Sequence, residues 1–218
     1  MKSKQSGFTL IEIAIVLVII GLLLGGVMKG QELIESSRAK SAANDMNGIV
    51  AAYNGYIDRY RRLPGDDGDL AALIARGGNW ATVTLAGNIN GAIAAANADT
   101  FAATGETATF FAHLRAAGFL TGDHRLGAVV DALPTNAFGG RTSINNAASQ
   151  GRPAARLSVC MSNVPGKAAR ALDVQLDDSA SNGGTLRANL GGGATAPAAA
   201  AAAAYDEAQT YTICRDML

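Results

Sequence analysis

The feature that most constrains this chain is an apolar run near its N-terminus, from Phe8 to Met28. Its 21 residues, FTLIEIAIVLVIIGLLLGGVM, include a single charged side chain, that of Glu12. As an α-helix that rises about 1.5 Å per residue, the run would be about 30 Å long, the thickness of the hydrocarbon core of a bilayer. The sequence therefore predicts a helix that can span a membrane.

A short polar segment, residues 1–7, precedes this run and carries Lys2 and Lys4. Because positive residues favour the cytoplasmic side, we expect this leader to stay in the cytoplasm and the C-terminal body to lie outside it. An ordinary secretory signal ends in an A-x-A-like cleavage site and is then discarded. No such site stands out after the run, whereas Gly7 separates the leader from it. Cleavage after Gly7 would remove the leader alone and retain the helix.

The segment Gly7–Glu12, GFTLIE, resembles the processing motif of the type IV pilin family, which includes the pseudopilins of type II secretion systems. The resemblance implies that a prepilin peptidase cuts the Gly7–Phe8 bond and N-methylates Phe8. It also implies that Glu12, the fifth residue of the mature chain, pairs with the amine of Phe8 in an adjacent subunit during assembly. A carboxylate within hydrocarbon costs about 2.5 kcal/mol or more, so a partner or function is expected. The alternative is a protonated Glu12 near the interface with no role.

Glycines within the apolar run form two small-xxx-small pairs, Gly21 with Gly25 and Gly26 with Gly30. Such pairs allow two helices to approach closely, which predicts tight packing against other helices in a filament core. Many pilins have a proline near the end of this stretch, where Lys29 stands here.

The apolar run leads into an amphipathic helical pattern. We expect one helix from about Phe8 to Arg62, because the Leu63-Pro64-Gly65 sequence should end it. Residues 8–28 would form its hydrophobic half, residues 29–63 its amphipathic half, and residues 64–218 a globular head. Apolar side chains at helical spacing define the face that packs on the head: Met46, Ile49, Val50, Tyr53, Ile57 and Tyr60.

The head is expected to be α+β, with the long helix packed on a small antiparallel sheet. Residues 64–155 are rich in turns and predict a long helix-to-sheet connection with one helix, Glu106–Ala117, ended by Gly118. Its inner face would carry Phe110, Phe111 and Leu114. The later part of the chain predicts strands at 156–161, 185–190 and 211–215, a short helix within 164–176, and a low-complexity loop or helix at 191–204.

Two cysteines, Cys160 and Cys214, fall on the two clearest strands. A structural zinc site normally needs four ligands, so in an exported body this pair predicts a disulfide rather than two buried thiols. The bond would pin the C-terminal edge of the sheet. A disulfide in this place resembles the disulfide-bounded C-terminal region of many pilins.

The chain has no motif for catalysis or for nucleotide binding, and only two histidines. We therefore expect no enzymatic activity and no cofactor, and we interpret His113 as a partly buried packing residue. Arg59, Arg61 and Arg62 could contact nucleic acid, but a solvated helix end explains them better. Two groups of aspartates could bind calcium, although turn formation is the commoner explanation: Asp66, Asp67 and Asp69, and Asp173, Asp177 and Asp178.

Together these features predict a structural subunit of a type IV pilus that serves adhesion, motility or DNA uptake. The alternative is a pseudopilin of a type II secretion system, and a membrane-anchored binding module is less favoured. Expected partners are other pilins in a filament, prepilin peptidase and the inner-membrane assembly machinery. The precursor would lie in a bacterial inner membrane, and the mature protein in a surface pilus or a periplasmic pseudopilus.

Overall fold

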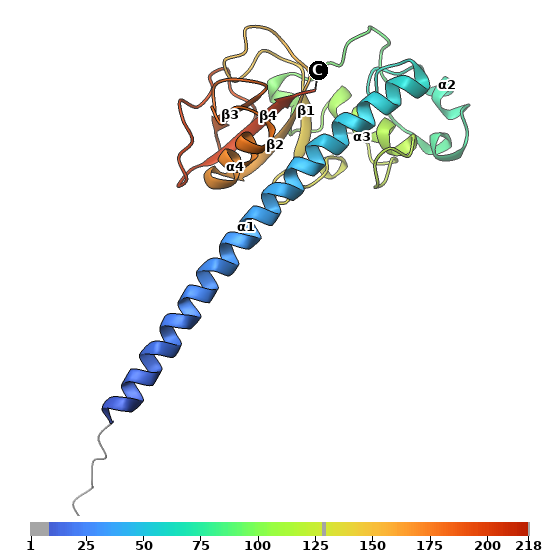
Figure 1. The fold of residues 1–218 in the computed structure, drawn as a ribbon. Helices are drawn as coiled ribbons and strands as arrows, with labels where there is room; N and C mark the ends of the chain where they lie inside the picture. The colour runs from blue at the N-terminus through green and yellow to red at the C-terminus, as the bar shows by residue number, and fades with distance from the viewer. Residues whose placement is uncertain (1–8, 128–129, 218) are drawn as a thin grey trace, which may run out of the picture. The chain divides into compact units, whose positions relative to one another are not determined.

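The structure, a computed structural model, describes residues 9–127 and 130–217 (Figure 1). The chain divides into two compact units, Met1–Ser37 and Arg38–Leu218, and helix α1, Leu10–Tyr60, runs through both. The helix ends two residues earlier than predicted. Arg61 has a left-handed backbone with φ 55°, which stops the helix before Pro64 can. The α+β class predicted from the sequence is confirmed.

Within the second unit, α1 buries one face in the hydrophobic core of the head. Met46, Ile49 and Tyr53 are buried as predicted, while Val50 and Ile57 are partly buried at the edge of the core. The spacing of three and four residues places the buried positions along one stripe of the helix. Four of the buried residues of α1 are alanines. The buried residues are Ala39, Ala42, Ala43, Met46, Ile49, Ala52, Tyr53 and Tyr56.

The sheet has four antiparallel strands in the order β1-β2-β4-β3 (Figure 1). Their bounds are β1 Thr142–Asn145, β2 Ser158–Pro165, β3 Leu186–Leu190 and β4 Thr210–Asp216. The three predicted strands are confirmed, but β1 lies in the stretch expected to be a connection. The prediction that the disulfide pins the C-terminal edge of the sheet is wrong, because β4 pairs with β2 on one side and β3 on the other.

The two faces of the sheet differ in character because side chains alternate along each strand. Ile144, Val159 and Ile213 point into the hydrophobic core that α1 shares. The alternate residues are polar or cysteine, and the structure buries them as well. They are Ser143, Asn145, Ser158, Cys160, Ser162, Asn189, Thr212 and Cys214.

Apart from residues 128–129, the connection between α1 and the sheet contains two α-helices, α2 (Leu70–Ile74) and α3 (Glu106–Ala116), and three short 3-10 helices. The 3-10 helices are η1 (Gly78–Thr82), η2 (Asn97–Asp99) and η3 (Val130–Ala132). After β2, helix α4 spans Gly166–Leu176, within the predicted range. Residues 191–204 contain no regular helix or strand, which agrees with the predicted loop.

Helix α3 is buried on every side, so the prediction of a single inner face was too narrow. Phe110, Phe111 and Leu114 are in the core as expected, and the surrounding loops cover the remaining face. Polar side chains of α3 bond to those loops, as when Arg115 donates to the carbonyl of Ala132. Gly118, with φ 79°, ends the helix as predicted.

His113 on α3 is fully buried rather than partly buried as predicted. Its Nδ1 accepts the N–H of Gly65 at 3.1 Å, which leaves Nε2 to donate to the carbonyl of Leu85, also at 3.1 Å. The rings of Tyr56 and Trp80 lie 6.3 Å and 5.6 Å from the imidazole. Burial lowers the pKa of His113 to about 4, so the ring is neutral at pH 7.

Acidification between pH 6.5 and pH 4 is expected to destabilise the head through His113. In this range the unfolded chain, with a histidine pKa near 6.5, binds a proton that the folded protein does not bind until about pH 4. The loss should approach about 3 kcal/mol in the free energy of unfolding. Denaturant unfolding of the detergent-solubilised protein at several pH values, followed by the fluorescence of Trp80, measures this change in the free energy of unfolding.

Comparing two histidine variants isolates this contribution. His113→Phe should weaken the dependence on pH, whereas His124→Asn should keep it, because the ring of His124 contacts the hydroxyl of Thr82 on the protein surface. Equal pH slopes in the two variants would show that His113 does not supply the effect.

Candidate functional site

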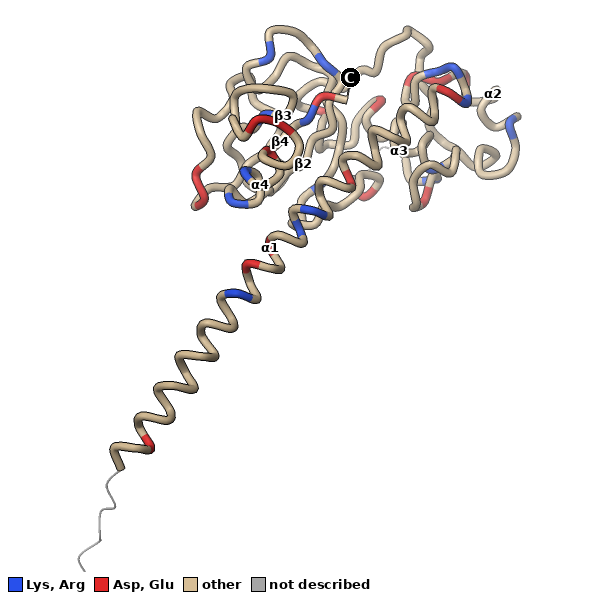
Figure 2. The backbone as a smooth tube through the Cα atoms, viewed as in Figure 1, with Lys and Arg blue, Asp and Glu red and all other residues tan. Residues whose placement is uncertain are grey.

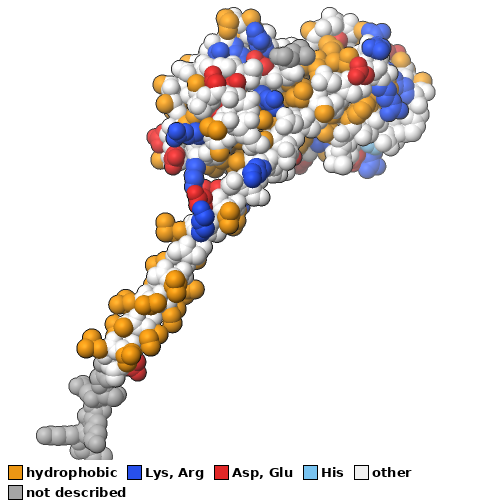
Figure 3. Space-filling view, viewed as in Figure 1, with side chains coloured by type: hydrophobic (Ala, Val, Ile, Leu, Met, Phe, Trp, Pro, Cys, Tyr) orange, Lys and Arg blue, Asp and Glu red, His pale blue; other side chains and the backbone are white. Residues whose placement is uncertain are grey.

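The apolar part of α1 in the first unit has no protein to cover it in the isolated chain. Its large side chains between Leu10 and Met28 are 45% to 92% exposed, and Figure 3 shows them along the helix. Within the described part of the chain, α1 is the one helix long and apolar enough to cross a membrane. A surface of this kind requires lipid or other protein around it.

Glu12 is the single charged residue in this apolar stretch (Figure 2). The structure places it in the first turn of α1, where it forms a capping box with Thr9. The Glu12 carboxylate accepts the backbone N–H and the hydroxyl of Thr9, both at 2.8 Å, while the Glu12 N–H approaches the Thr9 hydroxyl at 3.4 Å. The helix start therefore holds the carboxylate beside the residue that follows Phe8.

The sequence-based prediction gave Glu12 a partner in an adjacent subunit but did not include Thr9 as a partner in the same chain. A T-x-x-E spacing just before an apolar run is a recognised N-terminal signature of helices, so the signal was present in Thr9–Glu12. Gly7 and Phe8 lie outside the described residues, and cleavage, methylation and pairing with Glu12 stay predictions.

The four glycines predicted to pack between helices all lie on α1, on surface open in the isolated chain. A Cβ atom added at Gly21, Gly25, Gly26 or Gly30 would meet no heavy atom within 4 Å outside the local helix backbone. No contact with a described residue therefore requires glycine there, and the role of these residues between subunits stays a prediction.

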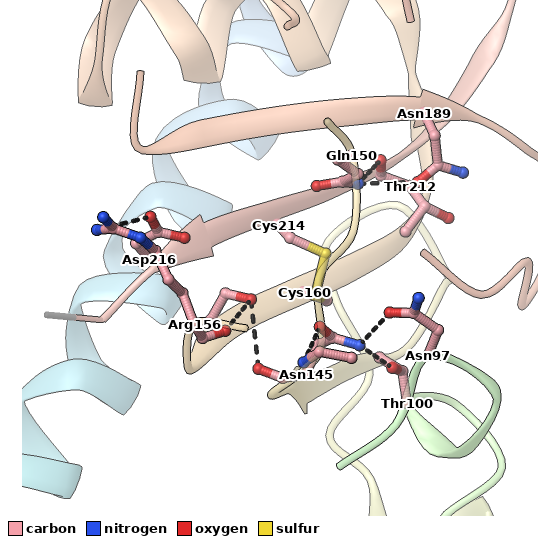
Figure 4. The surroundings of a disulfide bond; sticks show 12 residues. Asn97, Thr100, Asn145, Gln150, Arg156, Cys160, Asn189, Thr212, Cys214 and Asp216 are labelled. Atoms are coloured by element: carbon pink, nitrogen blue, oxygen red, sulfur yellow. Dashed lines mark hydrogen bonds and ion pairs between the residues drawn. A yellow bond between two sulfur atoms is a disulfide. The ribbon is translucent and has the colours of Figure 1, made fainter. Parts of the chain in front are cut away.

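The two cysteines form the predicted disulfide (Figure 4). Cys160 on β2 and Cys214 on β4 are directly paired in register, with their Cα atoms 4.0 Å apart. Both are fully buried, with Phe101 beside them. The bond therefore joins the two central strands of the sheet.

Polar side chains attach loops to the sheet face that carries the disulfide (Figure 4). The amide of Asn145 donates to Asn97 at 2.8 Å and to Thr100 at 3.0 Å. On the other side of the disulfide, the amide of Gln150 donates to the side chain of Asn189 at 2.8 Å. These bonds explain how a polar sheet face can be buried, since each amide finds partners.

A buried ion pair, absent from the sequence-based predictions, reinforces the same region. Arg152 donates to the Asp216 carboxylate at 2.8 Å, and the two side chains are 2% and 6% exposed. The same guanidinium donates to the Gln150 side chain and to the carbonyls of Thr185 and Cys214. It therefore ties the loop before β2 to both β4 and the start of β3.

The first group of calcium candidates is not brought together around a common point. Asp66 accepts the N–H groups of Asn90 and Gly91, and Asp69 caps α2 by accepting the N–H of Ala71. Asp67 accepts two hydrogen bonds from the guanidinium of Arg76, at 2.8 and 3.1 Å, and one from the hydroxyl of Tyr56 at 2.7 Å.

The second group, Asp173, Asp177 and Asp178, does converge, with one oxygen of each within 4.8 Å of the others. Burial raises the pKa of Asp173, which accepts the hydroxyl of Tyr205 at 2.7 Å. Calcium takes six to eight oxygen ligands, of which this group offers three. Calcium binding at either group stays a prediction.

Comparison with known proteins concerns the N-terminal segment. A family model described as the prokaryotic N-terminal methylation motif matches residues 2–28. This match covers residues 2–7 of the leader, the Gly7–Phe8 bond, Glu12 and the whole apolar run. No curated protein matches the chain.

Proposed function

We infer that this chain, which carries at residues 2–28 the prepilin signature of type IV pilins and pseudopilins, is a structural subunit of an extracytoplasmic filament. One observation carries the inference: the apolar run within the signature forms a helix whose large side chains between Leu10 and Met28 are exposed. The signature marks proteins that assemble rather than enzymes, and the exposed helix is the surface that assembly would cover.

Glu12 is proposed to change partners during assembly. In the membrane, the capping box with Thr9 supplies two hydrogen-bond donors to a carboxylate that hydrocarbon would otherwise leave unsolvated. In the filament, the N-terminal amine of Phe8 from an adjacent subunit would replace them and neutralise the charge. The stronger pair favours the assembled state and one axial register of neighbouring subunits.

Within this class we propose a type IV pilus subunit rather than a secretion pseudopilin. The long connection of residues 61–141 and the disulfide between the central strands support this choice. The alternative is supported by α1, which continues without interruption through Lys29, where many pilins have a proline. A membrane-anchored binding module is the third candidate.

Processing gives the most direct test of the proposal. Mass spectrometry of the mature protein from cells that contain a prepilin peptidase should show an N-methylated Phe8 as the first residue. Gly7→Leu should retain the leader, because the peptidase would lose its cleavage site, whereas Ser6→Ala should be processed normally. An intact leader on the unaltered protein in such cells would reject the assignment.

Location separates a pilus from a pseudopilus. Immunogold labelling of the head is expected to decorate long surface fibres. Labelling confined to the periplasm would instead support the pseudopilin, and an even distribution over the inner membrane without filaments would support the anchored binding module. Deletion of the assembly ATPase should remove the fibres while leaving the subunit in the membrane.

A further inference from the structure

The head has a basic cavity of about 350 Å³ at the end of α1, beside α2. Arg59, Tyr60, Arg76, Asn79 and Trp80 line it. Figure 2 shows both basic and acidic positions around this end of α1. The cavity lies in the second unit alone and has no part in the proposed assembly surface.

One arginine of the cavity is held rigidly and is already neutralised. The guanidinium of Arg76 makes bidentate bonds to Asp67 at 2.8 and 3.1 Å. It also lies 4.8 Å from the ring centres of both Tyr60 and Trp80, so cation–π contacts fix its plane. Arg76 thus forms an ordered wall of the cavity without adding net charge.

The other arginine has its charge uncompensated. Arg59 is exposed and makes no ion pair among the described residues; its one hydrogen bond, to the carbonyl of Ala117, is 3.5 Å long. Its guanidinium carbon lies 5.3 Å from the centre of the same Tyr60 ring. Two guanidinium groups therefore lie near one aromatic ring, and a carboxylate pairs with that of Arg76 alone.

No carboxylate is among the described residues that line this cavity, and Asp67 reaches it only through its bonds to Arg76. Asp58 precedes Arg59 in the chain but is not among the lining residues, and Asp66 is buried with its oxygens bonded to Asn90 and Gly91. Outside the cavity, the exposed Arg61 and Arg62 have no carboxylate partner among the described residues, and the exposed Asp58 and Asp69 of the same segment offset their charge. The uncompensated charge within the lining is therefore that of Arg59, and it favours an anion in the cavity.

We propose that this cavity binds a single oxyanion group, a carboxylate or phosphate carried on a ligand about as large as a monosaccharide. A guanidinium matches the planar geometry of a carboxylate and the oxygens of a phosphate, and Arg59 supplies free donors for such contacts. The volume is near the lower limit for ligand pockets, which fits one sugar unit rather than a polymer. The proposal gives Arg59 a role in a specific site, whereas the sequence-based interpretation places it at a solvated helix end.

Binding can be followed with Trp80, because it lines the cavity and is the single tryptophan of the chain. The full-length protein in non-ionic detergent at low ionic strength is titrated with glucuronate, glucose 6-phosphate, inorganic phosphate and neutral glucose. We expect a saturable fluorescence change with an anion and none with glucose. Saturation-transfer NMR of the ligands provides a second readout that does not depend on Trp80.

Two arginine variants decide whether the cavity is the site. R59Q should raise the dissociation constant about tenfold or more, since it removes a charged hydrogen-bond donor. R62Q removes the same charge outside the cavity and should change the constant less than about twofold, with both variants unfolding at the same denaturant concentration. Saturation by glucuronate but not phosphate identifies an acidic sugar, and saturation by inorganic phosphate alone identifies free phosphate.

Three results would overturn the proposal. The first is the absence of saturable binding of every anion by both readouts. The second is an equal loss of affinity in R59Q and R62Q, which would indicate general charge attraction. The third is equal binding of glucose, which would remove the requirement for an oxyanion.

Discussion

Glu12→Ala is expected to yield a protein that is inserted in the membrane and processed but does not assemble into filaments. Removal of the carboxylate makes the helix easier to accommodate in lipid, so insertion should not suffer. The proposed pair with the Phe8 amine would be lost, and breaking one side of a buried ion pair costs about 3–5 kcal/mol. The association constant of subunits should therefore fall by about a hundredfold or more.

Sheared filaments, quantified against the membrane-bound pool, measure this effect. Glu12→Gln keeps the size and hydrogen-bonding capacity of the side chain but not its charge, so it should also fail if pairing with the amine is the cause. Glu35→Ala removes a carboxylate from α1 outside the apolar run and should assemble normally. Filaments at the ordinary level from Glu12→Ala would show that Glu12 does not act in assembly.

The capping box adds a further comparison on the same helix. Thr9→Val keeps the shape of the side chain but removes the hydroxyl that donates to Glu12. If the box serves Glu12 only before assembly, this variant should still form filaments, although fewer subunits would be retained in the membrane. Loss of filaments equal to that of Glu12→Ala would mean that Thr9 is needed in the assembled state as well.

Loss of the disulfide is expected to produce the second large effect, a decrease of about 4 kcal/mol in the free energy of unfolding of the head. Cys160 and Cys214 are 54 residues apart, and the chain-entropy relation for a loop of this length predicts that value. The double variant Cys160→Ala, Cys214→Ala tests it by denaturant unfolding with Trp80 fluorescence. Reductant should destabilise the unaltered protein by a similar amount and leave the double variant unchanged.

Thiol labelling provides the control for this prediction. The denatured, unreduced protein should show no reactive thiol, and reduction should release two. Labelling of both cysteines without reductant would contradict the disulfide. An unfolding free energy within about 1 kcal/mol of the unaltered protein would instead show that packing around Phe101 and the loops, rather than the bond, stabilises this part of the sheet.

The features that could be predicted from the sequence depend on local patterns. The apolar run from Phe8 to Met28 predicts the first half of α1, and the spacing of Gly7 and Glu12 predicts the processing motif. Gly118 predicts the end of α3. The disulfide was predictable because the chain has only two cysteines.

Other features depend on contacts between distant residues and could not be predicted in this way. Strand β1 is four residues long, TSIN, and exists because Ser143 and Ile144 pair with Cys160 and Val159 of β2. The burial of α3 on all sides depends on loops that cover it, and no periodicity shows where a loop will lie. The cavity at Arg59 could not be predicted either, because it forms only where Arg76, from a separate segment of the chain, lies beside the end of α1.

The strand order has a consequence for when the head can be completed. Strand β4 follows β3 in the sequence, yet it lies between β2 and β3 in the sheet. Within the described sheet, β3 pairs with β4 alone. In a chain that emerges from its N-terminal end, β2 can pair with β1, but its other edge and the whole of β3 stay unpaired until residues 210–216 arrive between them. The sheet is therefore completed only after β4 has been exported, and removal of residues 210–216 would leave β3 without a strand partner and one edge of β2 open.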